Sequence, residues 1–190
     1  MVVRWRFAQL SSARLLRVVR QTNAESWKPP APNVLKINTD GAYRCSTKQG
    51  GWGYVIRDRF GDVVQAGAGA ADHLIDAFHA ELLANAVAIK TAKEKGMARV
   101  ELETDSLMLC NALQSNSFNL SVMGGAILEI KHVIASCFHS FSVNYCPRNC
   151  NKVAHELAAL GCNLQDVSSW TGCPPGMERL VTSDLAGSVI

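Results

Sequence analysis

Apolar and polar residues alternate in the first strand-like segment of the chain. Leu35, Ile37 and Thr39 take every second position, which is the period expected of a strand with one buried face. The segment then delivers a carboxylate, Asp40, followed by Gly41, where the backbone can turn because no β-carbon is in the way. We therefore predict a half-buried strand that presents an acidic side chain at its end.

Two more strands are predicted directly after this one. Residues 50–58 and 63–68 have the composition of strands, and turn-forming residues at 59–62 separate them. This arrangement predicts an antiparallel hairpin. The glycines within 50–58 indicate close backbone approach and not a phosphate-binding loop, because the flanking pattern is that of a hairpin instead of a strand followed by a helix.

The strongest helical pattern covers residues 75–95. Alanine, leucine and valine recur on one face at helical spacing, lysines populate the last turns, and Gly96 is placed to end the helix. Residues 98–104 predict a fourth strand, which should be reached by a parallel, right-handed crossover. The remaining predicted elements are a short helix from Ser106 to about Leu113, a helix over 122–136, a strand over 141–145, and a last helix capped by Asn149 or Asn151 that ends near Val167.

The predicted order, β-β-β-α-β-α-α-β-α, indicates an α/β fold with a mixed five-stranded sheet and helices on both sides. A chain of 190 residues with 48% apolar content can bury one good core. We therefore predict a folded domain over residues 33–167, preceded by a basic arm or linker over 1–30 and followed by a C-terminal extension over 168–190. The Pro-rich residues 27–32 mark the first boundary.

The positive charge is concentrated at the start of the chain. Residues 1–30 hold six lysines and arginines against one glutamate, whereas the remaining residues hold 13 basic against 15 acidic side chains. Residues 1–24 fit an organelle transit peptide in outline, and they fit equally well a leftover linker or a disordered basic arm. Because the domain itself is mildly acidic, its affinity for a polyanion would depend on local patches or metal ions.

The cysteines and the apolar runs bear on where the protein acts. Seven cysteines are scattered along the chain, and an odd number without a framework suits a reducing compartment. The longest apolar runs are too short to span a membrane. We therefore expect an intracellular protein of the nucleus or cytoplasm, or of an organelle if residues 1–24 are a transit peptide, with no membrane partner.

Three acidic residues are candidates for a shared metal site. Asp40 and Asp105 end two strands, and Glu81 lies on the apolar stripe of the 75–95 helix, where an unpaired carboxylate is costly to bury. Converging carboxylates repel one another and raise their pKa values unless cations neutralise them. Oxygen ligands suit Mg²⁺ or Mn²⁺, and two such ions, about 3.5–4 Å apart, support phosphodiester cleavage.

Each of these acids also has an ordinary structural interpretation. Asp40 can be a turn former, Glu81 a solvated helix residue and Asp105 a helix-entry acid stabilised by the helix dipole. Two other chemistries are disfavoured. The spacing of Cys146, Cys150, His155 and Cys162 is wrong for a zinc knuckle, and an actin-like ATPase would need further phosphate loops and roughly twice the length.

The order of these motifs resembles the type 1 ribonuclease H family, specifically the reverse-transcriptase-associated version abundant in plant retroelement-derived proteins. The resemblance covers about residues 34–161. The matching pieces are Asn38-Thr39-Asp40-Gly41-Ala42, Gly51-Trp52-Gly53 with Val55-Ile56-Arg57-Asp58, Ala80-Glu81, Glu103-Thr104-Asp105-Ser106 and Arg148-x-x-Asn151-x-x-Ala154-His155-x-Leu157-Ala158.

The resemblance implies a ribonuclease H-like fold and a monomeric, metal-dependent endonuclease that cleaves the RNA strand of RNA–DNA hybrids. By position, Asp40, Glu81 and Asp105 match the first three catalytic carboxylates and would hold the metal, two ions of Mg²⁺ or Mn²⁺. The candidate nucleic-acid contacts are Gly41, Ser106, Arg148 and Asn151, with Arg148 as a phosphate contact.

The fourth catalytic position departs from the family. Active members usually have an aspartate four residues after the asparagine that here is Asn151, and this chain has His155. Glu156 cannot simply substitute, because one step along a helix turns a side chain by about 100°. His155 can be a metal ligand or an acid–base group, and imidazole favours Mn²⁺ over Mg²⁺. The alternatives are therefore a weakened or inactive nucleic-acid-binding domain, or an interaction module that kept only the fold.

Overall fold

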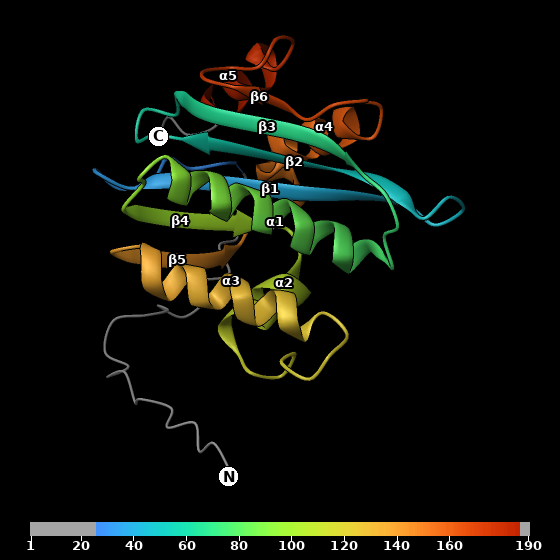
Figure 1. The fold of residues 1–190 in the computed structure, drawn as a ribbon. Helices are drawn as coiled ribbons and strands as arrows, with labels where there is room; N and C mark the ends of the chain where they lie inside the picture. The colour runs from blue at the N-terminus through green and yellow to red at the C-terminus, as the bar shows by residue number, and fades with distance from the viewer. Residues whose placement is uncertain (1–25, 187–190) are drawn as a thin grey trace.

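A six-stranded mixed sheet lies at the centre of the computed structural model, which describes residues 26–186 (Figure 1). The strand order is β5-β4-β1-β2-β3-β6. The predicted α/β fold is confirmed, with one strand more than the five expected. The strands are β1 (Leu35–Arg44), β2 (Gln49–Arg57), β3 (Val63–Ala71), β4 (Arg99–Thr104), β5 (Ser140–Tyr145) and β6 (Ser168–Trp170).

Parallel pairing of β1 with β4 determines where the acidic residues meet. The hairpin strands β1, β2 and β3 are antiparallel, as predicted, whereas β4 runs parallel to β1 and β5 runs parallel to β4. In this register Thr39 lies opposite Thr104. Asp40, the residue after Thr39, and Asp105, the residue directly after β4, therefore lie side by side where β4 ends. The prediction that the first strand ends at Asp40 was wrong, because β1 stays paired with β2 as far as Arg44.

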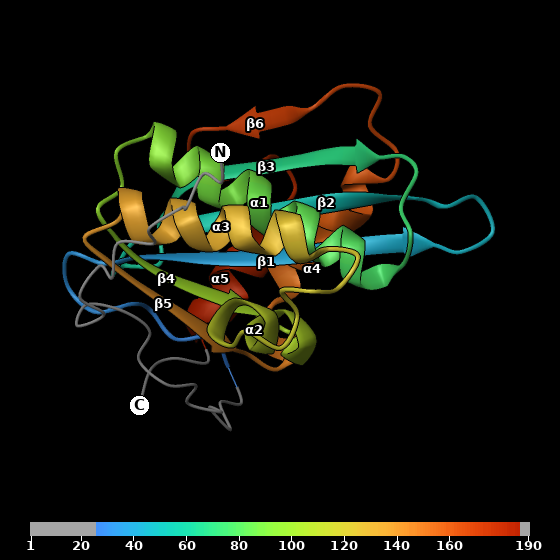
Figure 2. The same cartoon turned by 60° about the horizontal axis from the view of Figure 1, so that its bottom comes forward.

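The helices cover both faces of the sheet. In both views α1 and α3 lie in front of the sheet and α4 lies behind it (Figures 1 and 2). The larger apolar core fills the space under α1, α2 and α3, and a smaller one lies between α4, α5 and the other face. The helices are α1 (Ala77–Glu94), α2 (Leu107–Gln114), α3 (Gly124–Cys137), α4 (Lys152–Gly161) and α5 (Glu178–Ala186), with a 3₁₀ turn η1 (Arg148–Cys150).

Small residues let both flanking helices approach the sheet closely. The buried residues of α1 include Ala80, Ala84 and Ala88, which keep its axis near β1. On the opposite face, a β-carbon at Gly53 would lie 2.3 Å from the backbone nitrogen of Ala158 in α4. The glycines of the predicted hairpin therefore mark close backbone approach, as the sequence indicated.

The C-terminal residues add a sixth strand to the sheet, and the predicted end of the last helix was wrong. Helix α4 ends at Gly161 instead of continuing to Val167, because the chain turns there and returns as β6. Strand β6 pairs antiparallel with β3, and the side chain of Gln65 donates a 2.7 Å hydrogen bond to Ser169.

The two ends of the described chain meet on the α4 side of the sheet. Trp27 is buried, although it falls within the residues predicted as an arm. The guanidinium carbon of Arg57 lies 3.6 Å from the centre of the Trp27 ring, and Arg57 also forms a 2.7 Å ion pair with Asp184 of α5.

The predicted transit peptide or arm over residues 1–24 lies outside the described residues. No helix within residues 26–186 has the length and apolar character needed to cross a membrane.

Candidate active site

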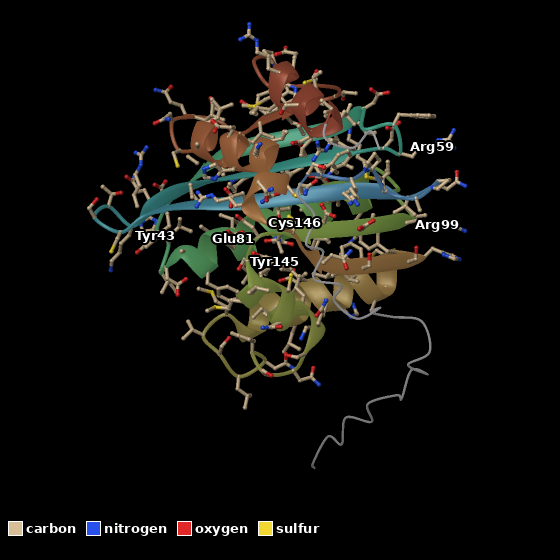
Figure 3. All side chains as sticks on the ribbon, turned by 180° about the vertical axis from the view of Figure 1, so that it is seen from behind. Tyr43, Arg59, Glu81, Arg99, Tyr145 and Cys146 are labelled. Atoms are coloured by element: carbon tan, nitrogen blue, oxygen red, sulfur yellow. The ribbon has the colours of Figure 1, made fainter. Side chains whose placement is uncertain are left out.

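Three carboxylates meet at the end of the sheet where β4 and β5 finish. One ligand oxygen from each of Asp40, Glu81 and Asp105 lies within 4.8 Å of the others. Figure 3 shows Glu81 and Tyr145, the last residue of β5, at this same end of the sheet. The structure thus brings together all three acids that the sequence selected for a metal site.

Backbone packing places Glu81 beside Asp40. Asp76 caps α1 by accepting a 2.8 Å hydrogen bond from the backbone of His79, so the helix begins just ahead of Glu81. Gly41 follows Asp40 and lies against the backbone of Ala80 and Glu81, where a β-carbon would lie only 2.3 to 2.6 Å from backbone atoms. The first turn of α1 is therefore held directly over the strand that carries Asp40.

Burial and mutual repulsion raise the pKa values of two of the three acids, Glu81 and Asp105. Burial is the main cause that raises the pKa of Glu81, to about 9, and the charges of Asp40 and Asp105 raise it further. A hydrogen bond donated by the backbone of Gly41 opposes this shift. Burial and then the charge of Asp40 likewise raise the pKa of Asp105, against weaker effects of Asn151 and Arg148.

The cluster fits a divalent cation. Oε2 of Glu81 is buried and has no hydrogen-bond partner among the described residues, a costly state unless the oxygen is protonated or ligates an ion. Carboxylate oxygens are the ligands that Mg²⁺ and Mn²⁺ prefer. Within residues 26–186 no other group of three or more acidic, histidine or cysteine side chains converges in this way, which also leaves the zinc interpretation without support.

His155 and Arg148 border the cluster on the side of α4. Nδ1 of His155, in the first turn of α4, lies 2.7 Å from Oδ2 of Asp40. One guanidinium nitrogen of Arg148 lies 3.1 Å from Nε2 of the same ring and 3.4 Å from its Nδ1. The position where the resemblance implies a fourth carboxylate is thus taken by a histidine in contact with Asp40.

Asn151 differs from its predicted structural role. It is the residue before α4, but its side chain makes no capping hydrogen bond. Its amide instead donates to the backbone oxygen of Thr39, at 2.9 Å, and to Oδ1 of Asp105, at 3.3 Å. The reason is the parallel pairing of β1 and β4, which brings both acceptors to the start of α4. Asn151 therefore links the backbone of β1, just before Asp40, to the side chain of Asp105.

Asn85 is a site residue that the sequence analysis missed. Its buried amide donates a 2.7 Å hydrogen bond to Oγ1 of Thr39 and a 3.3 Å hydrogen bond to the backbone oxygen of Glu81. The available signal was its place on the alanine-rich stripe of α1, one turn after Glu81, where a fully buried polar side chain needs a partner. It ties α1 to β1 beneath the cluster.

The remaining predicted contacts lie around the same end of the sheet. Ser106 caps α2, as predicted, by accepting a 3.2 Å hydrogen bond from the backbone of Leu109. A hollow of about 370 Å³ lies beside the cluster between α4 and α5. Its lining residues are Arg148, Asn149, Lys152, His155, Glu156 and Leu180. The nucleic-acid contacts of Gly41, Ser106, Arg148 and Asn151 stay predictions.

Comparison with known proteins places the chain by family and by fold. The family described as reverse transcriptase-like matches residues 38–161. Sequence comparison with curated proteins found no match.

Several solved structures share the fold. The N-terminal RNase H domain of a Mycobacterium tuberculosis protein is 19% identical, with a TM-score of 0.60, and the match covers 68% of this chain and 94% of that one. RNase H1 from Halobacterium salinarum NRC-1 is 23% identical, with a TM-score of 0.57 and coverage of 67% and 96%. LC11-RNase H1 in complex with an RNA/DNA hybrid is 21% identical, with a TM-score of 0.62 and coverage of 68% and 96%. These likenesses confirm the predicted ribonuclease H-like fold.

Proposed function

Because the chain belongs to the reverse transcriptase-like, ribonuclease H-like family, we propose that it is a metal-dependent endonuclease that hydrolyses the RNA strand of RNA–DNA hybrids. The observation that carries this proposal is the convergence of Asp40, Glu81 and Asp105 within 4.8 Å. An origin from a retroelement is part of the same proposal, and the family description supports it.

The three acids would hold Mg²⁺ or Mn²⁺. A bound cation of this kind activates a water molecule and stabilises the charge that develops on the leaving oxygen of a phosphodiester. The chain's own part is to hold the ligands in place, through Asn151 at Asp105 and through Asn85 under Glu81. Since the pKa of Glu81 is raised to about 9, cation binding near neutral pH should release a proton from this carboxyl group.

The proposed substrate is recognised by shape and charge. A protein distinguishes RNA from DNA through the 2′-hydroxyl and reads a hybrid by backbone geometry, so cleavage should be specific for the RNA strand and nearly independent of sequence. Arg148 and Lys152 line the hollow beside the cluster and supply the positive charge that a phosphate backbone needs. The hybrid bound to LC11-RNase H1 supports a nucleic-acid partner.

One observation favours a second candidate function. His155 stands where active family members have a fourth carboxylate, and it occupies one oxygen of Asp40. The alternative is therefore a domain that binds hybrid or duplex but cleaves it weakly or not at all.

A cleavage assay on end-labelled hybrid, duplex DNA and duplex RNA separates the candidates. The proposal expects cutting of the RNA strand of the hybrid in Mg²⁺ or Mn²⁺, and loss of cutting in Asp40→Asn, which keeps the shape of the side chain but loses its charge. If the Asp40→Asn variant cuts at the wild-type rate, the metal-site assignment is wrong. Binding without cutting supports the second candidate, and neither binding nor cutting supports a pure interaction module.

We further propose that the protein acts as a monomer in the nucleus or cytoplasm. If residues 1–24 are a transit peptide, the location is an organelle instead. Expression of these residues fused to a fluorescent protein separates the two cases, because a transit peptide directs the fusion to the organelle and a linker or basic arm does not.

A further inference from the structure

His155 competes with a metal ion for one oxygen of the Asp40 carboxylate. Its Nδ1 atom lies 2.7 Å from Oδ2 of Asp40, and the Asp40 side chain is 7% exposed. A carboxylate shared by two cations can offer one oxygen to each of them. Here one of the two oxygens of Asp40 is already engaged by a ring nitrogen.

Arg148 adds a permanent positive charge at the same place. Its guanidinium lies 3.1 Å from Nε2 of His155, and arginine stays protonated in proteins. The charge of Arg148 also reaches Asp105, where it lowers the pKa of the carboxyl group against the larger effect of burial. The side of the cluster that faces α4 is therefore lined by nitrogen atoms and positive charge.

The charges of the cluster balance with one divalent cation. Asp40, Glu81 and Asp105 supply three negative charges, and Arg148 offsets one of them, so one divalent cation neutralises the remaining two. Whatever the charge of His155, a second divalent cation would leave the cluster positive. No carboxylate of α4 supplies the missing charge, because Glu156 is exposed and lies outside the cluster of three acids.

We propose that the Arg148–His155 pair takes the place of a second metal ion, so that this site holds a single divalent cation on Asp40, Glu81 and Asp105. This inference rests on the proposed function, since it assumes that the acidic cluster binds metal. It changes the sequence-based expectation of two ions, and the reason is the single substitution of a carboxylate by His155.

Equilibrium binding of Mn²⁺ to the full chain, followed by electron paramagnetic resonance, tests the proposal without measuring cleavage. The wild type should bind one Mn²⁺ that is lost in Asp40→Asn, with the spectrum of an isolated ion. His155→Asp should bind a second Mn²⁺ and show the spectrum of a coupled pair, because two ions that share a carboxylate interact magnetically. The His155 side chain is 37% exposed, so the aspartate can be accommodated.

Two control variants isolate the cause. His155→Asn has the size of the aspartate without its charge and should bind one ion. Asn163→Asp adds the same charge at an exposed position beyond the end of α4 and should also bind one ion. Thermal unfolding of each variant verifies that it is folded.

The outcomes distinguish this inference from the function on which it rests. Two coupled ions in the wild type, both lost in Asp40→Asn, would overturn the single-ion site and leave the proposed nuclease function standing. A His155→Asp variant that is folded and still binds one ion would overturn it as well. Mn²⁺ binding that is equal in the wild type and in Asp40→Asn would overturn both proposals.

Discussion

Gly41 lies directly against the backbone of Glu81. A β-carbon on residue 41 would stand 2.4 Å from the backbone nitrogen of Glu81 and 2.3 Å from the carbonyl carbon of Ala80. Both are backbone atoms of α1, so neither can rotate away as a side chain would. This contact brings the carboxylates of Asp40 and Glu81, from two different elements, into one cluster.

Gly41→Ala should therefore damage the fold and the site together. The extra methyl group must push α1 away from β1, which should lower the free energy of unfolding by roughly 1–3 kcal/mol and weaken Mn²⁺ binding. Urea unfolding and Mn²⁺ titration measure the two effects. Gly125→Ala in α3, where a β-carbon would meet no atom within 4 Å, is the control and should be neutral or stabilising. Equal stability and equal Mn²⁺ affinity of Gly41→Ala and wild type would contradict the assignment.

The stability of the metal-free protein should fall as the pH rises. The pKa of Glu81 is raised from its ordinary value of 4.5 to about 9, mainly by burial. Between these values the folded chain keeps a proton that the unfolded chain releases, so the free energy of unfolding decreases with pH across this window and levels off above it. The raised pKa of Asp105 acts in the same direction.

Thermal unfolding in a chelator from pH 5 to pH 9 measures this slope. Glu81→Gln should make the slope shallower and should be more stable than the wild type at pH 8, because the amide is neutral in both states and folding need not take up a proton. Glu129→Gln, which changes an exposed side chain of α3, should leave the slope as it is. A metal-free wild type whose stability is constant from pH 5 to pH 9 would argue against a buried, protonated Glu81.

The Arg57–Asp184 ion pair should be one of the larger contributors to stability. The side chains are 1% and 3% exposed and lie 2.7 Å apart, so Asp184→Ala leaves a buried guanidinium without its carboxylate. Removing one partner of a buried pair costs about 3–5 kcal/mol. Urea unfolding tests this, with Glu94→Ala as a control, because the Lys90–Glu94 pair is exposed and should matter little. If both variants lose a similarly small part of the free energy of unfolding, the Arg57–Asp184 pair is not a major contributor to stability.

Most of the fold could be predicted from local sequence patterns. The alanine-rich face of α1 and the cap at Ser106 are signals contained within a few residues, and both were confirmed. The alternation over residues 35–39 correctly predicted a strand but wrongly predicted that one face is exposed. Residues 36–40 are all buried in β1, because α1 packs on one face of this strand and α4 on the other. Strand β6 carries no such signal. Its three residues, Ser168-Ser169-Trp170, become a strand only because β3 lies beside them.

The sequence identified the acidic residues of the site but not the contacts of the side chains that support them. The sequence selected Asp105 because it directly follows a strand and Glu81 because it lies on the apolar stripe of a helix. It selected Asp40 as a strand end, although this residue lies within β1. The amide of Asn151 instead bonds to residues 112 and 46 positions away, and Arg57 pairs with a residue 127 positions away. Such partners are set by the tertiary fold, so helix-capping preference gave the wrong partner for Asn151.

Arg148→Ala should weaken hybrid binding by a similar factor for every sequence. Arg148 lines the hollow beside the cluster, and loss of one phosphate contact should reduce the slope of log affinity against log salt by about one. Fluorescence anisotropy over a range of salt concentrations measures this. Arg99→Ala is the matched control, because Arg99 is exposed and lies at the start of β4, away from Glu81 (Figure 3). An unchanged slope in Arg148→Ala would remove this residue from the binding surface.

The metal preference of cleavage should follow from His155. A carboxylate at this position would add a negative charge and a hard oxygen ligand, both of which favour Mg²⁺. His155 supplies neither and contacts Asp40 instead. Cleavage by the wild type should therefore be low in Mg²⁺ and relatively better in Mn²⁺, because Mg²⁺ demands near-ideal octahedral coordination by oxygen and this site has one oxygen ligand fewer to offer.

His155→Asp should raise Mg²⁺-supported cleavage and narrow the preference for Mn²⁺. Initial rates on labelled hybrid in each metal give the ratio directly, and His155→Asn, which lacks the added charge, should not reproduce the gain. If the wild type already cleaves hybrid rapidly in Mg²⁺ and the His155→Asp variant cleaves it more slowly, His155 contributes directly to catalysis. If neither form cleaves in either metal while both bind hybrid, the chain is a binding domain, because restoring the fourth carboxylate would then have been insufficient to restore the reaction.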